Sequence, residues 1–168
     1  FDPQRMDCSV RPNDSKFNYV YALPDVSRKK QEREMDFASN ASEGIALENL
    51  LRRLNCDGSL DIVMPASIAF ARGERKLRSL FGKTYYIKEI SRLPRRFLAR
   101  PKSSDTSSGH AAGDYLLCVA RSPLYKVELG SLVEKDGVLV FEDEIKTLSI
   151  DELFGRNDEW SVELFLSG

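Results

Sequence analysis

The stretch ALENLLRRLNCDGSLDIVMPASIAF, residues 46–70, decides the fold, because it reads as a helix followed by a short buried strand. Apolar residues recur at helical spacing up to Leu54, and Arg52 and Arg53 lie in the last turn, where the helix dipole favours positive charge. We expect Asp57 and Gly58 to turn the chain. Residues 60–64 (LDIVM) then form a strand of the buried type, which Pro65 ends.

Four further segments extend this pattern in both directions. Residues 17–22 (FNYVYA), 85–93 (YYIKEISRL) and 115–120 (YLLCVA) have the β-branched and aromatic composition of strands, and residues 74–81 (ERKLRSLF) have the apolar spacing of a helix. The order is strand, helix, strand, helix, strand, loop, strand, which is typical of an α/β layered sheet. For residues 1–122 we therefore expect one domain with a mostly parallel sheet and helices on its faces.

The sequence pattern changes in the last part of the chain. After Pro123, residues 126–130 (KVELG), 137–143 (GVLVFED) and 160–166 (WSVELFL) are short strand-like pieces, and residues 149–154 favour a short helix. We therefore expect a small β-rich C-terminal extension over residues 123–168.

The overall composition fits a globular protein without a general attraction to nucleic acid. Of the 168 residues, 42% are hydrophobic and 30% are charged, and the formal net charge is −1. Any contact with nucleic acid therefore depends on a local basic patch. No apolar run approaches the roughly 20 residues of a membrane span, and no signal peptide opens the chain, so we expect no membrane contact and a cytoplasmic location.

Cysteine and histidine usage does not indicate a metal site or a catalytic pair. The three cysteines are widely spaced, and we expect them to be buried or incidental thiols in a reducing compartment (Cys8, Cys56, Cys118). His110 is the only histidine and lies in a small polar loop, where we expect it to be solvated. The acidic run 142–144 (EDE) is interpreted as a solvated turn.

Four pieces of the chain, in order, carry a resemblance to a known family: FNYVYALPDV (17–26), ALENLLRRLNCDGSLDIVMPASIAF (46–70), ERKLRSLFGKTYYIKEISRLPRRF (74–97) and GDYLLCVARS (113–122). From residue 17 to residue 122, the chain resembles the adenine-N6 DNA methyltransferases, above all the methylation subunits of type I restriction systems. The resemblance implies the rear part of a Rossmann-like methyltransferase sheet.

The resemblance also implies S-adenosylmethionine as the methyl donor and an Asn-Pro-Pro-aromatic tetrapeptide that holds the target adenine. In this chain Leu23 stands at the Asn position, Pro24 matches the first Pro, Asp25 replaces the second, and Val26 replaces the aromatic residue. Because the carboxamide acceptor and the stacking ring are both missing, we do not expect normal adenine transfer. No Gly-x-Gly precedes residue 17, so we do not expect this chain to hold the cofactor by itself.

A basic cluster follows the third expected strand and surrounds Phe97: Arg92, Arg95, Arg96, Arg100 and Lys102. Such a patch at a strand end can neutralise phosphates, so these residues are our candidate nucleic-acid contacts. The alternative is an ordinary charged loop.

Two interpretations of function stay open. In the first, the chain is the rear part of a methyltransferase domain from a DNA restriction–modification system and is inactive by itself. In the second, it is a non-catalytic scaffold that binds DNA, a specificity subunit or another subunit of such a system. An unrelated small α/β enzyme is a third reading, but no nucleophile–base pair or metal constellation supports it.

Overall fold

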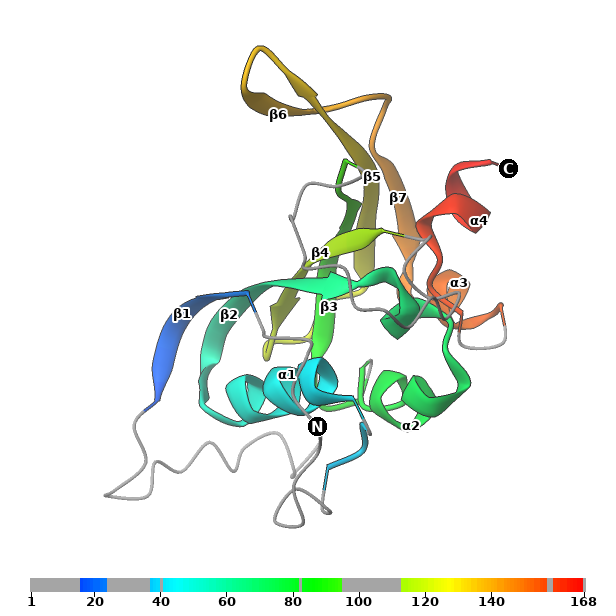
Figure 1. Ribbon diagram of the computed structural model, residues 1–168. Helices are drawn as coiled ribbons and strands as arrows, with labels where there is room; N and C mark the ends of the chain where they lie inside the picture. Colours follow the sequence, from blue (N-terminus) through cyan, green and yellow to red (C-terminus); the bar gives the residue numbers. More distant parts are fainter. Residues whose placement is uncertain are drawn as a thin grey trace, which may run out of the picture.

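The computed structural model describes residues 16–23, 37–39, 41–81, 83–94, 113–156 and 159–167. Figure 1 shows how the helices and strands are arranged. Along the chain, the described elements are the strands β1 (Phe17–Ala22), β2 (Leu54–Pro65), β3 (Tyr86–Arg92), β4 (Asp114–Ala120), β5 (Lys126–Lys135), β6 (Val138–Phe141) and β7 (Lys146–Ser149), the α-helices α1 (Ser42–Arg52), α2 (Arg75–Arg78), α3 (Ile150–Phe154) and α4 (Val162–Leu166), and the 3-10 helices η3 (Ala66–Ala69) and η4 (Arg72–Glu74).

The described strands form one seven-stranded sheet in the order β1-β2-β4-β3-β5-β6, with β7 also paired to β5. This confirms a layered α/β fold. We expected a mostly parallel sheet, but the pairing is mixed. Two pairs are parallel (β1–β2, β3–β5), and four are antiparallel (β2–β4, β3–β4, β5–β6, β5–β7). The main reason is that β4 reverses direction after β3 and inserts between β2 and β3.

Helices cover one face of this sheet. In Figure 1, α1 and α2 lie side by side below β2 and β3, while α3 and α4 lie beside β7. The main core fills the space between these layers and takes residues from α1, β2, β3 and β4, such as Leu51, Ile62, Ile90 and Leu117. A smaller apolar cluster of Val63, Leu93 and Leu132 is separate from that core.

Asp57 and Gly58 do not turn the chain, which corrects the sequence-based expectation. Both residues lie inside β2, which begins at Leu54, directly after α1 and Arg53. A Cβ atom at position 58 would lie 2.9 Å from the carbonyl oxygen of Phe17. The glycine therefore allows a close approach of β1, at the point where the β1–β2 register shifts.

The expected strands at residues 60–64, 85–93 and 115–120 are confirmed as parts of β2, β3 and β4. The expected helix at residues 74–81 is shorter, because only Arg75–Arg78 is α-helical and Arg72–Glu74 before it is a 3-10 turn.

The tail contributes to the same sheet and the same core. β5 pairs with β3, and β5 and β6 are joined by a two-residue turn at Asp136 and Gly137, whose φ angles are 54° and 77°. The expected helix near residue 150 is confirmed as α3, with a capping box at Ser149. The expected strand at residues 160–166 is wrong, because Val162–Leu166 is the helix α4. Val162 and Phe165 are buried at a spacing of three, which suits a helix.

The expectation of three unpaired thiols is also wrong. Cys56 is disulfide-bonded, whereas Cys118 is a free, half-buried thiol. Among the described residues, none of the helices is long and apolar enough to cross a membrane.

The boundary expected after residue 122 stays a prediction, and Trp160 offers a test. Its ring is fully buried, with Phe81 at 5.1 Å and Phe154 at 5.8 Å between ring centroids. We expect Trp160→Ala to cost about 3–5 kcal/mol and to move one single urea transition, because both parts share this core. Tyr125→Ala, at a side chain that is 79% exposed, is the control and should change little. Two separate transitions would instead indicate independently folding units.

Candidate functional site at the carboxyl edge of the sheet

The carboxyl ends of three strands meet at one edge of the sheet. β1 and β2 are parallel, and β3 runs in the same direction because both β2 and β3 are antiparallel to β4. Pro65 at the end of β2 pairs with Asp114, and Arg92 at the end of β3 pairs with Tyr115. Ligands of open α/β sheets commonly bind outside the carboxyl ends of the strands, so this edge is the candidate site.

Leu23 marks one end of this edge. It follows β1 directly, and its side chain is exposed and has no polar atom. Three strand spacings separate β1 from β3, which places Leu23 and Arg92 on the order of 14 Å apart. The other three positions of the tetrapeptide, Pro24, Asp25 and Val26, lie outside the described residues.

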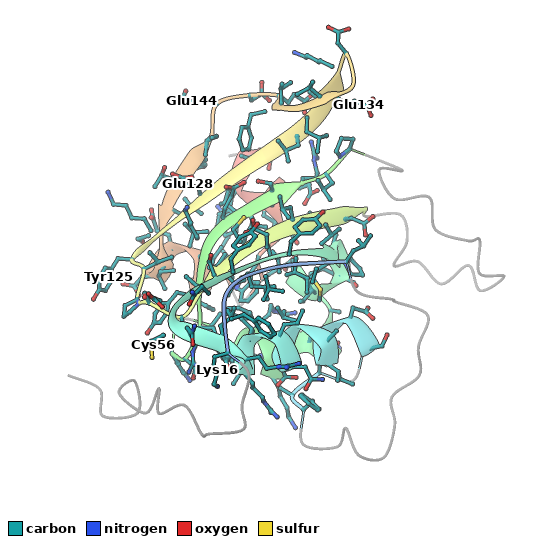
Figure 2. All side chains as sticks on the ribbon, turned by 90° about the vertical axis from the view of Figure 1, so that its left-hand side faces the viewer. Lys16, Cys56, Tyr125, Glu128, Glu134 and Glu144 are labelled. Atoms are coloured by element: carbon teal, nitrogen blue, oxygen red, sulfur yellow. The ribbon has the colours of Figure 1, made fainter. Side chains whose placement is uncertain are left out.

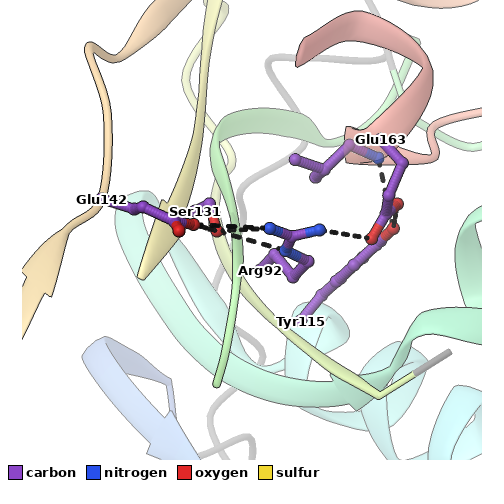
Figure 3. A network of polar contacts seen from close by, with 6 residues as sticks. Arg92, Tyr115, Ser131, Glu142 and Glu163 are labelled. Atoms are coloured by element: carbon purple, nitrogen blue, oxygen red, sulfur yellow. Dashed lines mark hydrogen bonds and ion pairs between the residues drawn. The ribbon is translucent and has the colours of Figure 1, made fainter. Parts of the chain in front are cut away.

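Arg92 marks the other end, and its guanidinium group is held by three side chains (Figure 3). Nη2 donates to Oγ of Ser131 at 2.8 Å, and Nε donates to the same oxygen at 3.2 Å. Oε2 of Glu142 lies 3.6 Å from Nη2, and Oε1 of Glu163 lies 3.6 Å from Nη1. Two carboxylates therefore flank the one positive charge, and the three groups together carry a net charge of −1 when all are ionised.

Tyr115 ties this network to the core. Its hydroxyl group donates to Oε2 of Glu163 at 2.5 Å and accepts from the backbone N–H of Val162 at 3.2 Å. Burial, followed by the hydrogen bond to Glu163, raises the pKa of Tyr115 well above its ordinary value. The phenol therefore stays protonated and acts as a fixed donor at neutral pH.

A cavity of about 530 Å³ opens beside this network. Its wall combines the polar groups described above with apolar and aromatic side chains, among them Phe70, Leu93, Pro94, Leu132 and Val133. A concave surface with a few convergent polar groups is the usual form of a small-molecule or base pocket.

The other members of the basic cluster, Arg95, Arg96, Arg100 and Lys102, lie outside the described residues, as does His110. Arg92 is therefore the one predicted contact that the structure places, and it is engaged by carboxylates. Glu142 and Glu163 were not predicted from the sequence, in which Glu142 is part of an expected solvated turn and Glu163 is part of an expected strand. The β3–β5 pairing of Arg92 with Ser131 could have indicated the network, but its register is not visible in the sequence.

A second polar group lies across β1, β2 and β4. The hydroxyl group of Tyr19 donates to Oδ2 of Asp61 at 2.6 Å, and Asp61 is the cross-strand neighbour of Cys118. Burial, followed by the hydrogen bond to Asp61, raises the pKa of Cys118, so this thiol is a poor nucleophile. Within the described ranges, no group of three or more His, Cys, Asp or Glu residues is arranged to hold a metal ion.

Tyr115→Phe tests whether the phenol holds the network. The change leaves the buried N–H of Val162 and the Glu163 carboxylate without their partner, so we expect a loss of about 1–3 kcal/mol in unfolding free energy. Urea denaturation measures it, with Tyr125→Phe at an exposed position as the matched control. Equal stability of the two variants would contradict the assigned role.

The chain is similar to known proteins in structure and not in sequence. No family model matches the chain, and no curated protein matches it by sequence. A modification subunit of a putative type I restriction enzyme from Vibrio vulnificus is 14% identical, with a TM-score of 0.61, and the match covers 83% of this chain and 35% of that one. The type I methyltransferase subunit from Streptococcus thermophilus is 14% identical, with a TM-score of 0.65 and coverage of 96% and 40%.

The type IIG restriction endonuclease BpuSI is also similar, with 16% identity, a TM-score of 0.61 and coverage of 91% of this chain and 22% of that one. This chain thus spans well under half the length of each of these three structures. The likeness extends over most of this chain, including the tail. The chain therefore has the fold of part of the methyltransferase subunit of type I restriction–modification systems.

Proposed function

We propose that this chain serves a DNA restriction–modification system as the rear part of an adenine-N6 methyltransferase-like domain, and that it does not transfer methyl groups by itself. The observation that carries the proposal is the shared fold, with Leu23 placed at the carboxyl edge where the resemblance calls for an Asn side chain. An aliphatic side chain cannot accept a hydrogen bond from the amino group of an extruded adenine.

The described residues do not fit S-adenosylmethionine, the donor that the family resemblance implies. Such a cofactor needs a glycine-bearing loop between a strand and the helix that follows it, so that the backbone can approach it closely. Among the described glycines, only Gly73 lies between a strand and the helix that follows it, in the 3-10 turn η4, and a Cβ atom there would meet nothing within 4 Å, so this turn shows no close backbone approach. The other described glycines lie inside α1 or a strand, before β4, in a hairpin turn or at the end of α3 (Gly44, Gly58, Gly130, Gly113, Gly137, Gly155). A separate polypeptide segment would have to supply the cofactor site.

Isothermal titration of the purified chain with S-adenosylmethionine tests this part of the proposal. We expect no saturable binding at micromolar to millimolar cofactor. A methyl-transfer assay on adenine-containing duplex DNA should likewise show no product. Saturable binding, or methylated adenine formed by this chain alone, would overturn the assignment as a non-catalytic part.

For DNA, we propose that Arg95, Arg96, Arg100 and Lys102 contact phosphates and that Arg92 does not. Glu142 and Glu163 already neutralise Arg92, so a phosphate gains little there. Alternatively, these basic residues bind a protein partner such as a specificity subunit. This alternative is the scaffold interpretation given above.

A fluorescence-anisotropy titration with duplex DNA distinguishes these groups. We expect Arg95→Glu/Arg96→Glu to lower the affinity at least tenfold at low salt and to reduce the salt slope by about 2, because two phosphate contacts are lost. Arg92→Gln should change the affinity little.

The control is Arg72→Glu/Lys76→Glu, which reverses two exposed charges on η4 and α2. If the control weakened binding as much as Arg95→Glu/Arg96→Glu, the attraction would be a general charge effect. If neither double variant changed the affinity for DNA, the proposed phosphate contacts would be wrong, and the scaffold interpretation without DNA contact would be favoured.

A further inference from the structure

The inference concerns Glu74, a buried acidic residue at the contact between α1 and η4. α1 and α2 lie side by side beneath the sheet (Figure 1), and Glu74 is the last residue of η4, directly before α2. Its side chain is only 8% exposed. A Cβ atom at position 44, in the first turn of α1, would lie 3.0 Å from Oε2 of Glu74. The carboxyl group is therefore packed against this turn and shielded from water.

The carboxyl group of Glu74 is only partly satisfied in this position. Ser39 and Ala41 are its hydrogen-bonding neighbours, but Oε2 has no hydrogen-bond partner in the described part of the chain. Glu48 on α1, which is 3% exposed, differs in this respect. Its two oxygens accept from the backbone N–H groups of Ala38 at 3.1 Å and Ser39 at 3.2 Å. The surroundings of Glu48 thus suit a negative charge, whereas those of Glu74 do not.

The charged groups near Glu74 do not offset the cost of its burial. Glu43 and Glu48 on α1 are negative, and Arg78 on α2 is positive. Burial has the largest effect and raises the pKa of Glu74 above its ordinary value. Glu43 raises this pKa as well, while hydrogen bonding to Ser39 and the charge of Arg78 lower it less than burial raises it. The folded chain therefore favours the neutral carboxyl group.

We propose that Glu74 forms a pH-sensitive contact between α1 and residues 66–74, closed when its carboxyl group is neutral and loosened when the proton leaves to the solvent. Residues 66–74 connect β2 with α2 and include Phe70, which lines the cavity at the carboxyl edge of the sheet. The position of one cavity wall is thereby linked to the protonation of a residue that does not line the cavity.

Arg78 explains why the response extends from Glu74 to Phe70. Its Nη1 donates to the carbonyl oxygen of Ile68 at 2.8 Å and to that of Ala71 at 2.9 Å, on either side of Phe70. An ionised Glu74 that attracts the guanidinium group weakens these two hydrogen bonds. An ionised Glu74 that turns to water instead removes η4 from the first turn of α1. Both movements loosen the same segment.

The direction of the pH effect follows from the raised pKa. Because the folded chain holds this proton more tightly than the unfolded chain does, the contribution of Glu74 to stability is fully present below the ordinary pKa of a glutamate. It is lost as the pH rises through the raised pKa of the folded state. One proton limits this loss to about tenfold in the opening equilibrium for each pH unit. The effect requires neither cofactor nor DNA, so it does not depend on the proposed function.

Hydrogen exchange of the purified chain between about pH 4 and pH 8 tests the proposal, with each rate corrected for the intrinsic effect of pH. In the wild type, we expect the protection of residues 66–74 and of the first turn of α1 to fall as the pH rises. In Glu74→Gln, which is neutral at every pH and similar in size, this fall should be absent. Glu134→Gln, at an exposed position of β5, is the matched control and should behave like the wild type.

Urea midpoints separate Glu74 from the other buried glutamate. Glu74→Gln should raise the midpoint above that of the wild type at the upper end of this pH range, because it removes a buried charge. Glu48→Gln should lower the midpoint throughout, because one of its two acceptor oxygens becomes an amide nitrogen, and the N–H of Ala38 or Ser39 then loses its partner.

Carbon-13 NMR of the glutamate carboxyl carbons measures the titration of Glu74 in the wild-type chain, without any variant. A midpoint above the ordinary glutamate range supports the proposal, and a midpoint within or below that range would overturn it. A fall in protection that persists in Glu74→Gln would overturn it as well. So would a urea midpoint that Glu74→Gln lowers at all pH values, because the carboxylate would then serve as a structural acceptor.

Discussion

The antiparallel insertion of β4 between β2 and β3 is the constraint on which the rest of the structure depends. β4 exchanges backbone hydrogen bonds with both neighbours along its whole length and buries Tyr115, Leu117 and Val119 on the helix side. Because β4 fixes the register of both strands, the ends of β2 and β3 arrive at the same edge. The cavity and the arginine network exist only where these ends coincide.

The tail completes that edge from two directions. Ser131 comes from β5 and Glu142 directly follows β6, whereas Glu163 comes from α4 (Figure 3). The capping box at Ser149 begins α3, and Trp160 packs between Phe81 and Phe154 before α4 begins. The tail therefore contributes both to the core and to the polar network around Arg92.

Much of the fold could be predicted from the sequence, because the strong signals are local. The apolar runs at residues 60–64 and 115–120 identified two central strands, and the residues of the four family-like pieces indicated the methyltransferase-like arrangement. Strand direction could not be predicted, since a continuous apolar run such as YLLCVA has the same composition in parallel and antiparallel pairing. Gly58 was wrongly predicted to lie in a turn, because glycine is favoured both in turns and where two backbones approach each other closely.

The site was less predictable for a similar reason. Arg92 was found from its neighbours in sequence, but its actual partners lie 39, 50 and 71 positions further along the chain (Ser131, Glu142, Glu163). Charge patterning describes local segments and contains no information on contacts at this separation. The absence of a carboxamide at Leu23 was visible at once, because it needs only a comparison of side-chain chemistry.

The two carboxylates that contact Arg92 are attached to the protein in different ways, because Glu142 follows the β5–β6 hairpin and Glu163 lies on α4. Residues 132–135 of β5 pair with β6 and with no other described strand, and Glu134 lies far from Lys16, at the opposite end of the molecule (Figure 2). Such a projecting ribbon, with few buried contacts, opens locally at a small cost in free energy. Glu142 lies at the base of this ribbon, where its backbone N–H donates to the carbonyl oxygen of Ser131 at 2.8 Å, while Glu163 is anchored through Tyr115. Opening of residues 132–135 alone would thus leave both carboxylates beside the guanidinium group, and Glu142 would leave it only if the bond to Ser131 broke as well.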